Sequence, residues 1–368
     1  MRRLTVPILG LLLAISLIMF DLTILSSGRT ALRPNLQKGV ALGLYRTDRG
    51  MSYYRPVLDK ISSLGATHLS LPVYLFQDSA YTTSLYSKPT DGATPEQHDM
   101  VFREVISYAH RLGMKVMVSP IVDIENPVNN QWRGVVAPTD WAAWFESYRE
   151  FVRHYAEIGE ALDVEFFNVG TELVSSEYRA EEWKRTIWSV REVFSGKLVY
   201  SANWDHYDTI EFWDELDFLG LSAYYELAPT DDPTVEDLLL GWTPIKRALL
   251  DWQIRWNKPI LFTEIGYTSQ SGSARRPWNY TASGPVNLEE QRRCYMALKE
   301  AGENEPDFAG LYLWNVEPET GGPNDTNYTF LGKPAEAVVS EWYRGIPPDA
   351  GMTDIAVNIV ERFFRSIQ

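Results

Sequence analysis

Short runs of consecutive apolar residues recur along the chain, and a longer amphipathic stretch follows each of them. Runs without a polar face are typical of parallel strands that are covered on both sides. We expect eight strands, at Gly39–Leu44, His68–Val73, Lys115–Ser119, Val164–Val169, Leu198–Ala202, Phe218–Ser222, Pro259–Phe262 and Ala309–Leu313. Eight parallel strands alternating with helices close a barrel, so the pattern predicts an α/β fold, a single (β/α)8 TIM barrel.

The stretches between these runs carry signals for the start and the end of helices. Ser52 is placed to cap a helix that ends at Gly65. Thr94, followed by proline, opens the next helix, and Thr139 precedes a long third one. The sequence Asn-Leu-Glu-Glu from Asn287 has the pattern of a capping box. The alternation of strand and helix signals therefore continues to the last expected strand.

The first residues form a separate, strongly apolar segment. After Met-Arg-Arg, residues 4–20 contain no charged side chain. This run is longer than the ~7–15-residue core of a secretory signal and slightly short of the ~20 residues that span a bilayer. We expect residues 1–27 to be an uncleaved signal-anchor that leaves the rest of the chain exported and membrane-anchored on the extracytoplasmic side. A cleaved signal peptide, and hence secretion, is the alternative.

The remainder divides into a linker, one barrel domain and a tail. Residues 28–37 are polar and contain a proline, which indicates a linker. No low-complexity stretch interrupts residues 38–346, so they are expected to form the barrel as one domain. In residues 347–368 apolar side chains recur near helical spacing, which predicts an extra helix packed on the barrel. A helix lying on the membrane is the alternative, disfavoured by the tail's modest basic character.

Composition narrows the possible partners. The 368 residues carry a net charge of −15, without a basic cluster beyond the first residues, which excludes nucleic acid as a partner. One cysteine and five histidines without ligand spacing give no reason to expect a metal or another cofactor. The 13 Trp and 20 Tyr residues suggest a carbohydrate ligand, because aromatic faces stack on sugar rings, although large cores also use them. We expect a monomer.

Two glutamates follow expected strands at equivalent places. Glu172 comes after the fourth strand and Glu264 after the seventh. In a barrel both would lie at the mouth formed by the carboxyl ends of the strands, where such folds carry their chemistry. Two opposed glutamates at a barrel mouth are typical of glycoside hydrolases, in which one protonates the leaving oxygen and the other attacks the anomeric carbon. A strand-end glutamate paired with an arginine is the alternative for either residue alone, but their shared placement favours an active site.

Other strand ends contribute aromatic and polar side chains. Trp204 and Trp314 are candidate platforms for a sugar ring, whereas most other tryptophans are expected to pack in the core. Tyr224 is placed to orient a nucleophilic carboxylate, and His206 either binds substrate or caps a loop. The candidate substrate-binding residues at the ends of strands five, six and eight are Asn203, Trp204, His206, Tyr224, Tyr225 and Trp314.

A series of short motifs between about Lys38 and Tyr343 resembles glycoside hydrolase family 113. The motifs are Trp132-Arg-Gly134, Trp141-Ala-Ala-Trp-Phe145, Gly170-Thr-Glu-Leu173, Ala202-Asn-Trp204, Phe212-Trp-Asp214, Leu216-Asp-Phe-Leu-Gly220, Thr263-Glu-Ile-Gly-Tyr267 and Gly332-Lys-Pro-Ala335. The resemblance implies a retaining (β/α)8 enzyme of clan A that is similar to β-mannanases. It implies that Glu172 is the acid/base and Glu264 the nucleophile. It also implies a substrate cleft that includes Asp123, Trp132, Arg133 and Thr171.

Thr171 stands where clan A usually has asparagine, a change that family 113 itself tolerates. Two further departures fall at the substrate cleft: Ser119-Pro-Ile121 replaces a Lys-Pro-His type of motif, and Val316 replaces a second aromatic residue. These changes keep the two glutamates and leave specificity for mannan open.

The expected function is therefore hydrolysis of β-linked glycans by double displacement, with β-1,4-mannan or manno-oligosaccharides as candidate substrates. For this mechanism the two carboxyl groups should lie roughly 5–5.5 Å apart, and Glu172 should have a raised pKa as the acid. The alternative is an inactive, membrane-anchored barrel that binds glycans.

Overall fold

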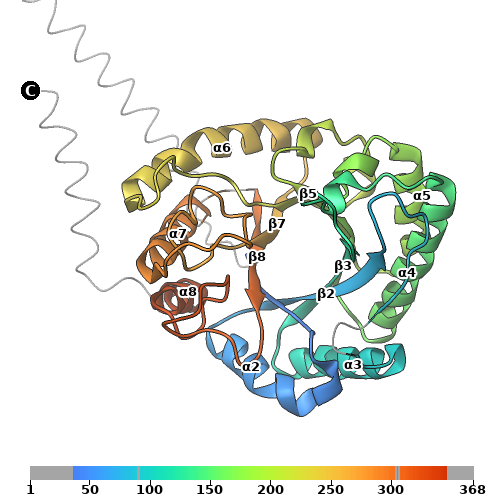
Figure 1. Cartoon of the computed structure of the whole chain (residues 1–368), viewed down its shortest axis with the longest axis horizontal. Helices are drawn as coiled ribbons and strands as arrows, with labels where there is room; N and C mark the ends of the chain where they lie inside the picture. The colour runs from blue at the N-terminus through green and yellow to red at the C-terminus, as the bar shows by residue number, and fades with distance from the viewer. Residues whose placement is uncertain (1–35, 89–91, 303–304, 306, 346–368) are drawn as a thin grey trace, which may run out of the picture.

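Eight parallel strands form a closed barrel in the computed structural model, which describes residues 36–88, 92–302, 305 and 307–345 (Figure 1). Each strand pairs with its neighbours in chain order, and β1 pairs with β8 to close the sheet. The strands are β1 Gln37–Leu42, β2 His68–Gln77, β3 Lys115–Ile124, β4 Phe166–Thr171, β5 Lys197–Asn203, β6 Leu219–Ser222, β7 Ile260–Ile265 and β8 Phe308–Val316. The predicted (β/α)8 barrel is confirmed.

Helices surround the barrel and cover the outer face of the sheet (Figure 1). They are α2 Met51–Ser63, α3 Pro95–Arg111, α4 Trp141–Ala161, α5 Ala180–Arg191, α6 Val235–Trp256, α7 Leu288–Gly302 and α8 Pro334–Arg344. Short 3-10 helices lie in the loops: η1 Thr47–Arg49, η2 Arg133–Val135, η3 Val174–Ser176, η4 Tyr207–Thr209 and η5 Trp213–Glu215. Each long helix follows a strand, so the loops after the strands gather at one end of the barrel.

Several strands extend beyond the predicted apolar runs. β2 and β3 pair in unbroken register from His68 with Lys115 to Gln77 with Ile124. β1 begins at Gln37, which was assigned to the linker, because Gln37 pairs with Gly310 of β8. β7 continues through Glu264, so this glutamate lies within the strand. Gln37 and Glu264 are polar and gave no apolar signal, whereas the added residues of β2 and β3 are mostly apolar. Pairing in the sheet sets the ends of these two strands.

Side chains fill the barrel interior near the amino ends of the strands. One buried cluster there consists of Met117, Phe166, Val199, Leu261 and Tyr312. The barrel is therefore a packed core at this end, not a pore. A larger buried cluster lies between the sheet and the helices and includes the tryptophans Trp144, Trp183, Trp213, Trp242 and Trp252, as predicted for most of them.

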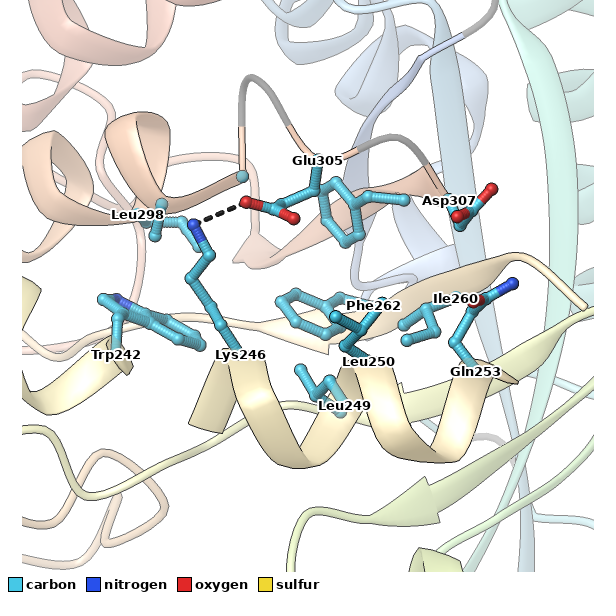
Figure 2. Close-up of a pocket in the computed structure, with 13 residues that line it drawn as sticks. Trp242, Lys246, Leu249, Leu250, Gln253, Ile260, Phe262, Leu298, Glu305 and Asp307 are labelled. Carbon is cyan, nitrogen blue, oxygen red and sulfur yellow. Dashed lines mark ion pairs between the residues drawn. The ribbon is translucent and has the colours of Figure 1, made fainter. Parts of the chain in front are cut away.

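A small apolar cavity of about 70 Å³ remains between α6, α7 and the sheet (Figure 2). Phe262 and Leu298 line it, and an ion pair between Lys246 and Glu305 at 2.6 Å lies beside it. Ile260 and Phe308, the first residues of β7 and β8, also border the cavity. It therefore lies at the end of the barrel opposite the strand ends that carry the two glutamates.

Two of the predicted helix caps are confirmed and one is wrong. Thr94 and Gln97 form a capping box at α3, and the Asn287 Oδ1 accepts the Glu290 backbone N–H at 3.0 Å. Ser52, however, lies inside the first turn of α2, which begins at Met51 after Gly50. Gly50 has a φ of 66°, a conformation that glycine adopts readily, so the chain turns into the helix before it reaches Ser52.

The predicted segments at the two ends fall mostly outside the described residues. The expected signal-anchor of residues 1–27 and the expected helix of residues 347–368 are not described. Within residues 36–345, apart from the short gaps, no helix is both long and apolar enough to cross a membrane.

Replacing Thr94 by alanine should lower the free energy of unfolding by about 1 kcal/mol, because α3 loses its capping hydrogen bond. Thr94→Ser should retain most of the stability, and Ser52→Ala should cost much less than Thr94→Ala. Urea unfolding of the three variants measures these differences. An equal loss for Ser52→Ala and Thr94→Ala would contradict the helix starts described above.

Candidate active site

Glu172 and Glu264 are both buried at the mouth of the barrel, each with 6% of its surface exposed. Glu264 is the next-to-last residue of β7, and Glu172 directly follows β4. The charge of Glu172 is among the causes that raise the pKa of Glu264, so the two carboxylates lie within electrostatic range. The structure thus brings together the two glutamates that the sequence singled out.

Glu264 has one hydrogen-bonded oxygen and one without a partner. The Tyr224 hydroxyl, which follows β6, donates to Glu264 Oε2 at 3.2 Å. The other oxygen, Oε1, is buried and accepts no hydrogen bond from the described residues. Burial and the charge of Glu172 raise the pKa of Glu264 to about 8, although Arg133 and the Tyr224 hydrogen bond act in the opposite direction. Glu264 therefore has one buried oxygen that no described residue binds.

Glu172 is paired with an arginine. Arg133 Nη1 lies 2.9 Å from Glu172 Oε2, and Arg133 Nε donates to the Val122 carbonyl at 3.0 Å. Burial works against the charge of Arg133, but Glu172, Asp123 and Glu264 outweigh it and raise its pKa. Of the two glutamates, Glu172 carries the ion pair with Arg133. The raised pKa expected of the acid stays a prediction.

The backbone at Glu172 is held in a strained conformation. Its φ is 52°, in the left-handed region that residues other than glycine seldom occupy. The Glu172 N–H donates to the Ser201 carbonyl at 2.8 Å, and the Leu173 N–H donates to the Tyr200 hydroxyl at 3.1 Å. Tyr200 in turn donates to Glu177 Oε1 at 2.8 Å. Ser201 and Tyr200 thus fix the chain on either side of this turn, and Glu177 holds the Tyr200 hydroxyl.

Sequence reasoning missed Tyr200 and Glu177. Tyr200 lies inside the apolar run of β5, where it has the appearance of a core residue. Glu177 is 5% exposed, and burial raises its pKa to about 7. A glutamate that follows Glu172 by five residues carried no signal of burial, because only the folded chain places it beneath Tyr200.

Thr171 takes part in a buried network in the barrel wall. Its hydroxyl donates to the Pro120 carbonyl at 2.9 Å and accepts a hydrogen bond from Asn168 Nδ2 at 2.9 Å. The same Asn168 nitrogen donates to Ser119 Oγ at 2.9 Å. Thr171 is only 1% exposed, so its hydroxyl supports the neighbouring Glu172 rather than facing the mouth. Ser119, which departs from the family pattern, and Thr171, which departs from the clan A pattern, therefore share one partner.

Two further tyrosines, which sequence analysis did not single out, lie close to the pair. The hydroxyl groups of Tyr45 and Tyr74 are 2.7 Å apart. Burial raises the pKa of Tyr45, and the charge of Glu264 contributes. Tyr45 follows the predicted first strand, so its place in the chain was a usable signal. Tyr74 lies in the part of β2 beyond the predicted run and gave none.

The candidate residues after β3 and near the end of β5 differ in exposure: Trp132 and His206 are exposed, whereas Asn203, the last residue of β5, is buried. The ring of Trp132 packs over Gly134, where an added Cβ would lie 2.4 Å from the ring, and 38% of Trp132 is exposed. Asn203 Nδ2 and His206 Nδ1 each lie 2.6 Å from Asp205 Oδ1. No side-chain hydrogen bond from His206 caps the short helix that follows it.

The remaining candidates differ in how they are placed. Trp204 packs edge-on against Tyr225, with ring centroids 5.6 Å apart, and Tyr225 also packs against Trp242 of α6 at 5.9 Å. Tyr225 is thus buried towards the helix side. Trp314 is half-buried in β8. Asp123 Oδ1 accepts the backbone N–H of Ile124 at 3.2 Å, and the charge of Asp123 favours that of Arg133.

The chemistry available at this mouth comes from carboxylates. Within the described residues, no group of three or more His, Cys, Asp and Glu side chains is placed to hold a metal ion. A buried carboxylate with a free oxygen beside a second carboxylate paired with arginine can supply a nucleophile and a proton donor. Such a pair at the mouth of a (β/α)8 barrel defines a glycoside hydrolase.

The family comparison identifies the chain more closely. Residues 43–333 match the model of Glycoside Hydrolase Family 113, and the chain belongs to this family. The resemblance inferred from the sequence motifs is thereby confirmed. No curated protein matches the chain.

Solved structures agree with this assignment. A GH113 β-1,4-mannanase in a complex is 27% identical, with a TM-score of 0.75 over 84% of this chain and 99% of that one. The GH113 β-mannanase AaManA from Alicyclobacillus acidocaldarius, in complex with ManMIm, is also 27% identical, with a TM-score of 0.75 over 86% and 100%. The endo-β-1,4-mannanase from Thermotoga petrophila, at 13% identity and a TM-score of 0.54 over 87% and 79%, shares the fold.

Tyr200→Phe should lower kcat by about 10- to 100-fold, because the backbone at Glu172 loses the hydroxyl that holds it. Tyr148→Phe is a matched control, since the Tyr148 hydroxyl also donates one buried hydrogen bond, to the Val169 carbonyl at 2.9 Å. Both variants should lose roughly 1–3 kcal/mol of stability. Hydrolysis rates and urea unfolding test this pair. Equal kcat values in the two variants would contradict a positioning role for Tyr200.

Glu264→Gln should stabilise the protein more at pH 9 than at pH 5. The folded-state pKa of Glu264 is raised from 4.5 to about 8, so its favourable contribution is present below about 4.5 and is lost as the pH rises through 8. Thermal unfolding at the two pH values measures the difference, and the exposed Glu300→Gln serves as a control. A gain in stability that is equal at both pH values would show that Glu264 is not a buried carboxyl with a raised pKa.

Proposed function

We propose that this enzyme is a retaining glycosidase that hydrolyses β-1,4-linked mannan or manno-oligosaccharides. Glu264 is the nucleophile and Glu172 the acid/base. One observation carries the assignment of roles: the buried Oε1 of Glu264 lacks a hydrogen bond within the described residues, while Tyr224 holds Oε2. A buried carboxylate oxygen without a hydrogen bond destabilises the folded protein, and such an oxygen is often explained by a catalytic role.

In the first step Glu264 Oε1 attacks the anomeric carbon of the sugar. The bond from that carbon to the glycosidic oxygen breaks, and this oxygen takes the proton of Glu172 and leaves as the hydroxyl group of the departing sugar. A glycosyl ester on Glu264 remains. In the second step the Glu172 carboxylate takes a proton from water as the water oxygen attacks the same carbon. Glu264 is released as a carboxylate, and two inversions retain the configuration.

Arg133 stabilises the charge that develops on Glu172 as the leaving group takes its proton. The ion pair at 2.9 Å places the guanidinium directly on that carboxylate. The raised pKa of Glu264 means that the carboxyl pair holds a proton near neutral pH. A glycosidic oxygen next to Glu172 favours that proton on Glu172, which leaves Glu264 ionised for attack.

The choice of mannan rests on the relatives. The two family 113 structures with 27% identity are β-mannanases, and the half-exposed ring of Trp132 suits a sugar face. The signal-anchor expected at residues 1–27 completes the proposal: it would hold the barrel at the extracytoplasmic face of a membrane, where polymeric glycans are accessible.

Incubation with a 2-deoxy-2-fluoro-β-mannosyl fluoride tests the nucleophile. The wild-type protein should gain the mass of one fluoromannosyl group on the peptide that contains Glu264, and Glu264→Gln should remain unlabelled. Glu264→Gln should also lose on the order of 10⁴-fold or more in kcat on β-mannan. NMR should show the β-anomer as the first product.

Three outcomes would overturn the proposal. A label on another residue would displace Glu264 as the nucleophile, and an α-anomer as the first product would indicate inversion. Absence of both labelling and turnover, with glycan binding retained, would instead support an inactive glycan-binding barrel.

A further inference from the structure

Trp278 stands out among the tryptophans because it is both exposed and held in place. It lies in the long loop of residues 266–287 between β7 and α7, and 44% of it is exposed. Sequence analysis expected most tryptophans to pack in the core and did not single out Trp278. Its indole Nε1 donates to Glu226 Oε1 at 3.3 Å. Since Glu226 follows β6, Trp278 connects two loops on the catalytic face of the barrel.

A chain of contacts links Trp278 to the nucleophile. The Tyr328 hydroxyl donates to the carbonyl of Pro277 at 2.5 Å, directly before Trp278. The Tyr328 ring lies 6.0 Å, centroid to centroid, from the ring of Tyr224, whose hydroxyl binds Glu264. Burial raises the pKa of Tyr328, with Glu172 and Glu264 as the next causes, so Tyr328 lies within the electrostatic range of both. Trp278 is therefore linked to the nucleophile indirectly, through Tyr328 and Tyr224.

The loop that carries Trp278 is tied to the barrel at several points. Glu290, which is fully buried, accepts the backbone N–H groups of Gly272 at 3.0 Å and Ala274 at 2.9 Å. Further along, the Gly284 N–H donates to Gln270 Oε1 at 2.8 Å. An anchored loop loses little conformational freedom when a ligand binds. Trp278 thus presents an apolar face in a preorganised position.

We propose that Trp278 is a stacking platform for a sugar unit of a β-linked oligosaccharide or polysaccharide, away from the bond that is cleaved. This rests on the proposed function of the same cleft. The exposed indole face covers the apolar face of the sugar ring, while the hydrogen bond to Glu226 sets the orientation of the indole. Because the platform lies beyond the catalytic pair, only chains long enough to reach it gain affinity.

Trp188 provides a matched control. It is 50% exposed, and its Nε1 also donates to a glutamate, Glu215, at 2.9 Å. It lies on α5, on the outer wall of the barrel, without any contact to the catalytic pair. Exposure and a glutamate partner are therefore the same in the two residues, and only their place on the barrel differs.

Binding of manno-oligosaccharides of increasing length to the Glu264→Gln protein, measured by calorimetry, tests the platform. Adding Trp278→Ala should weaken binding of the longer chains roughly three- to tenfold or more and leave the disaccharide unaffected. Trp278→Phe should retain most of the affinity, and Glu226→Ala should lose part of it. Trp188→Ala should bind every chain as the parent does.

The outcomes separate the platform from the proposed function. Equal affinities for the Trp278→Ala and Trp188→Ala proteins at every length would overturn the platform, even where Glu264 becomes labelled. Equal weakening at all lengths would also overturn it, because it would indicate a general disturbance of the cleft. If mannan chains do not bind, β-glucan and galactan series replace them. A length-dependent loss there would support Trp278 and reject mannan as the substrate, and no such loss would overturn the platform.

Discussion

The burial of two like-charged carboxylates in one barrel mouth is the constraint on which the rest of the site depends. A buried charge without a partner is strongly destabilising, and a second one nearby adds repulsion. The chain supplies one guanidinium, from Arg133, and places it on Glu172. Among the described residues, Glu264 is bound by the hydroxyl of Tyr224 alone and keeps one oxygen without a partner. Because their partners differ, the two glutamates are chemically different and take separate roles in the proposed mechanism.

Hydrogen bonds from the surrounding strands hold the two buried glutamates rigidly in place. The left-handed backbone at Glu172 persists because Ser201 and Tyr200, on the adjacent strand, bind the N–H groups on both sides of the turn. Beneath it, Asn168 bridges Ser119 of β3 and Thr171 of β4. The departure from the family pattern at Ser119 and the departure from clan A at Thr171 are thus joined by one side chain. Their hydrogen bonds lie within the barrel wall, so the catalytic pair is preserved although the residues around it differ.

Rigid support by hydrogen bonds and packed rings extends outward to the rim of the cleft. Tyr328 connects the loop of Trp278 to Tyr224, so the groups proposed to bind a distant sugar and the nucleophile share one framework. Loops that carry function usually depend on a rigid scaffold, and here the loop after β7 is itself tied to α7 through Glu290. Binding energy gained along the glycan can then be used to hold the reacting sugar in place.

The sequence alone determined the barrel, the level at which Glu172 and Glu264 lie, and the family. These features are encoded locally, in apolar runs of strand length and in motifs that follow them directly. The tertiary structure decided the rest. It extended β2 to Gln77 and β3 to Ile124 by pairing, and it placed Arg133 on Glu172. It also buried Glu177 against the Tyr200 hydroxyl and left Trp278 exposed in the loop after β7. Such contacts join residues far apart in the chain, and no local pattern specifies them.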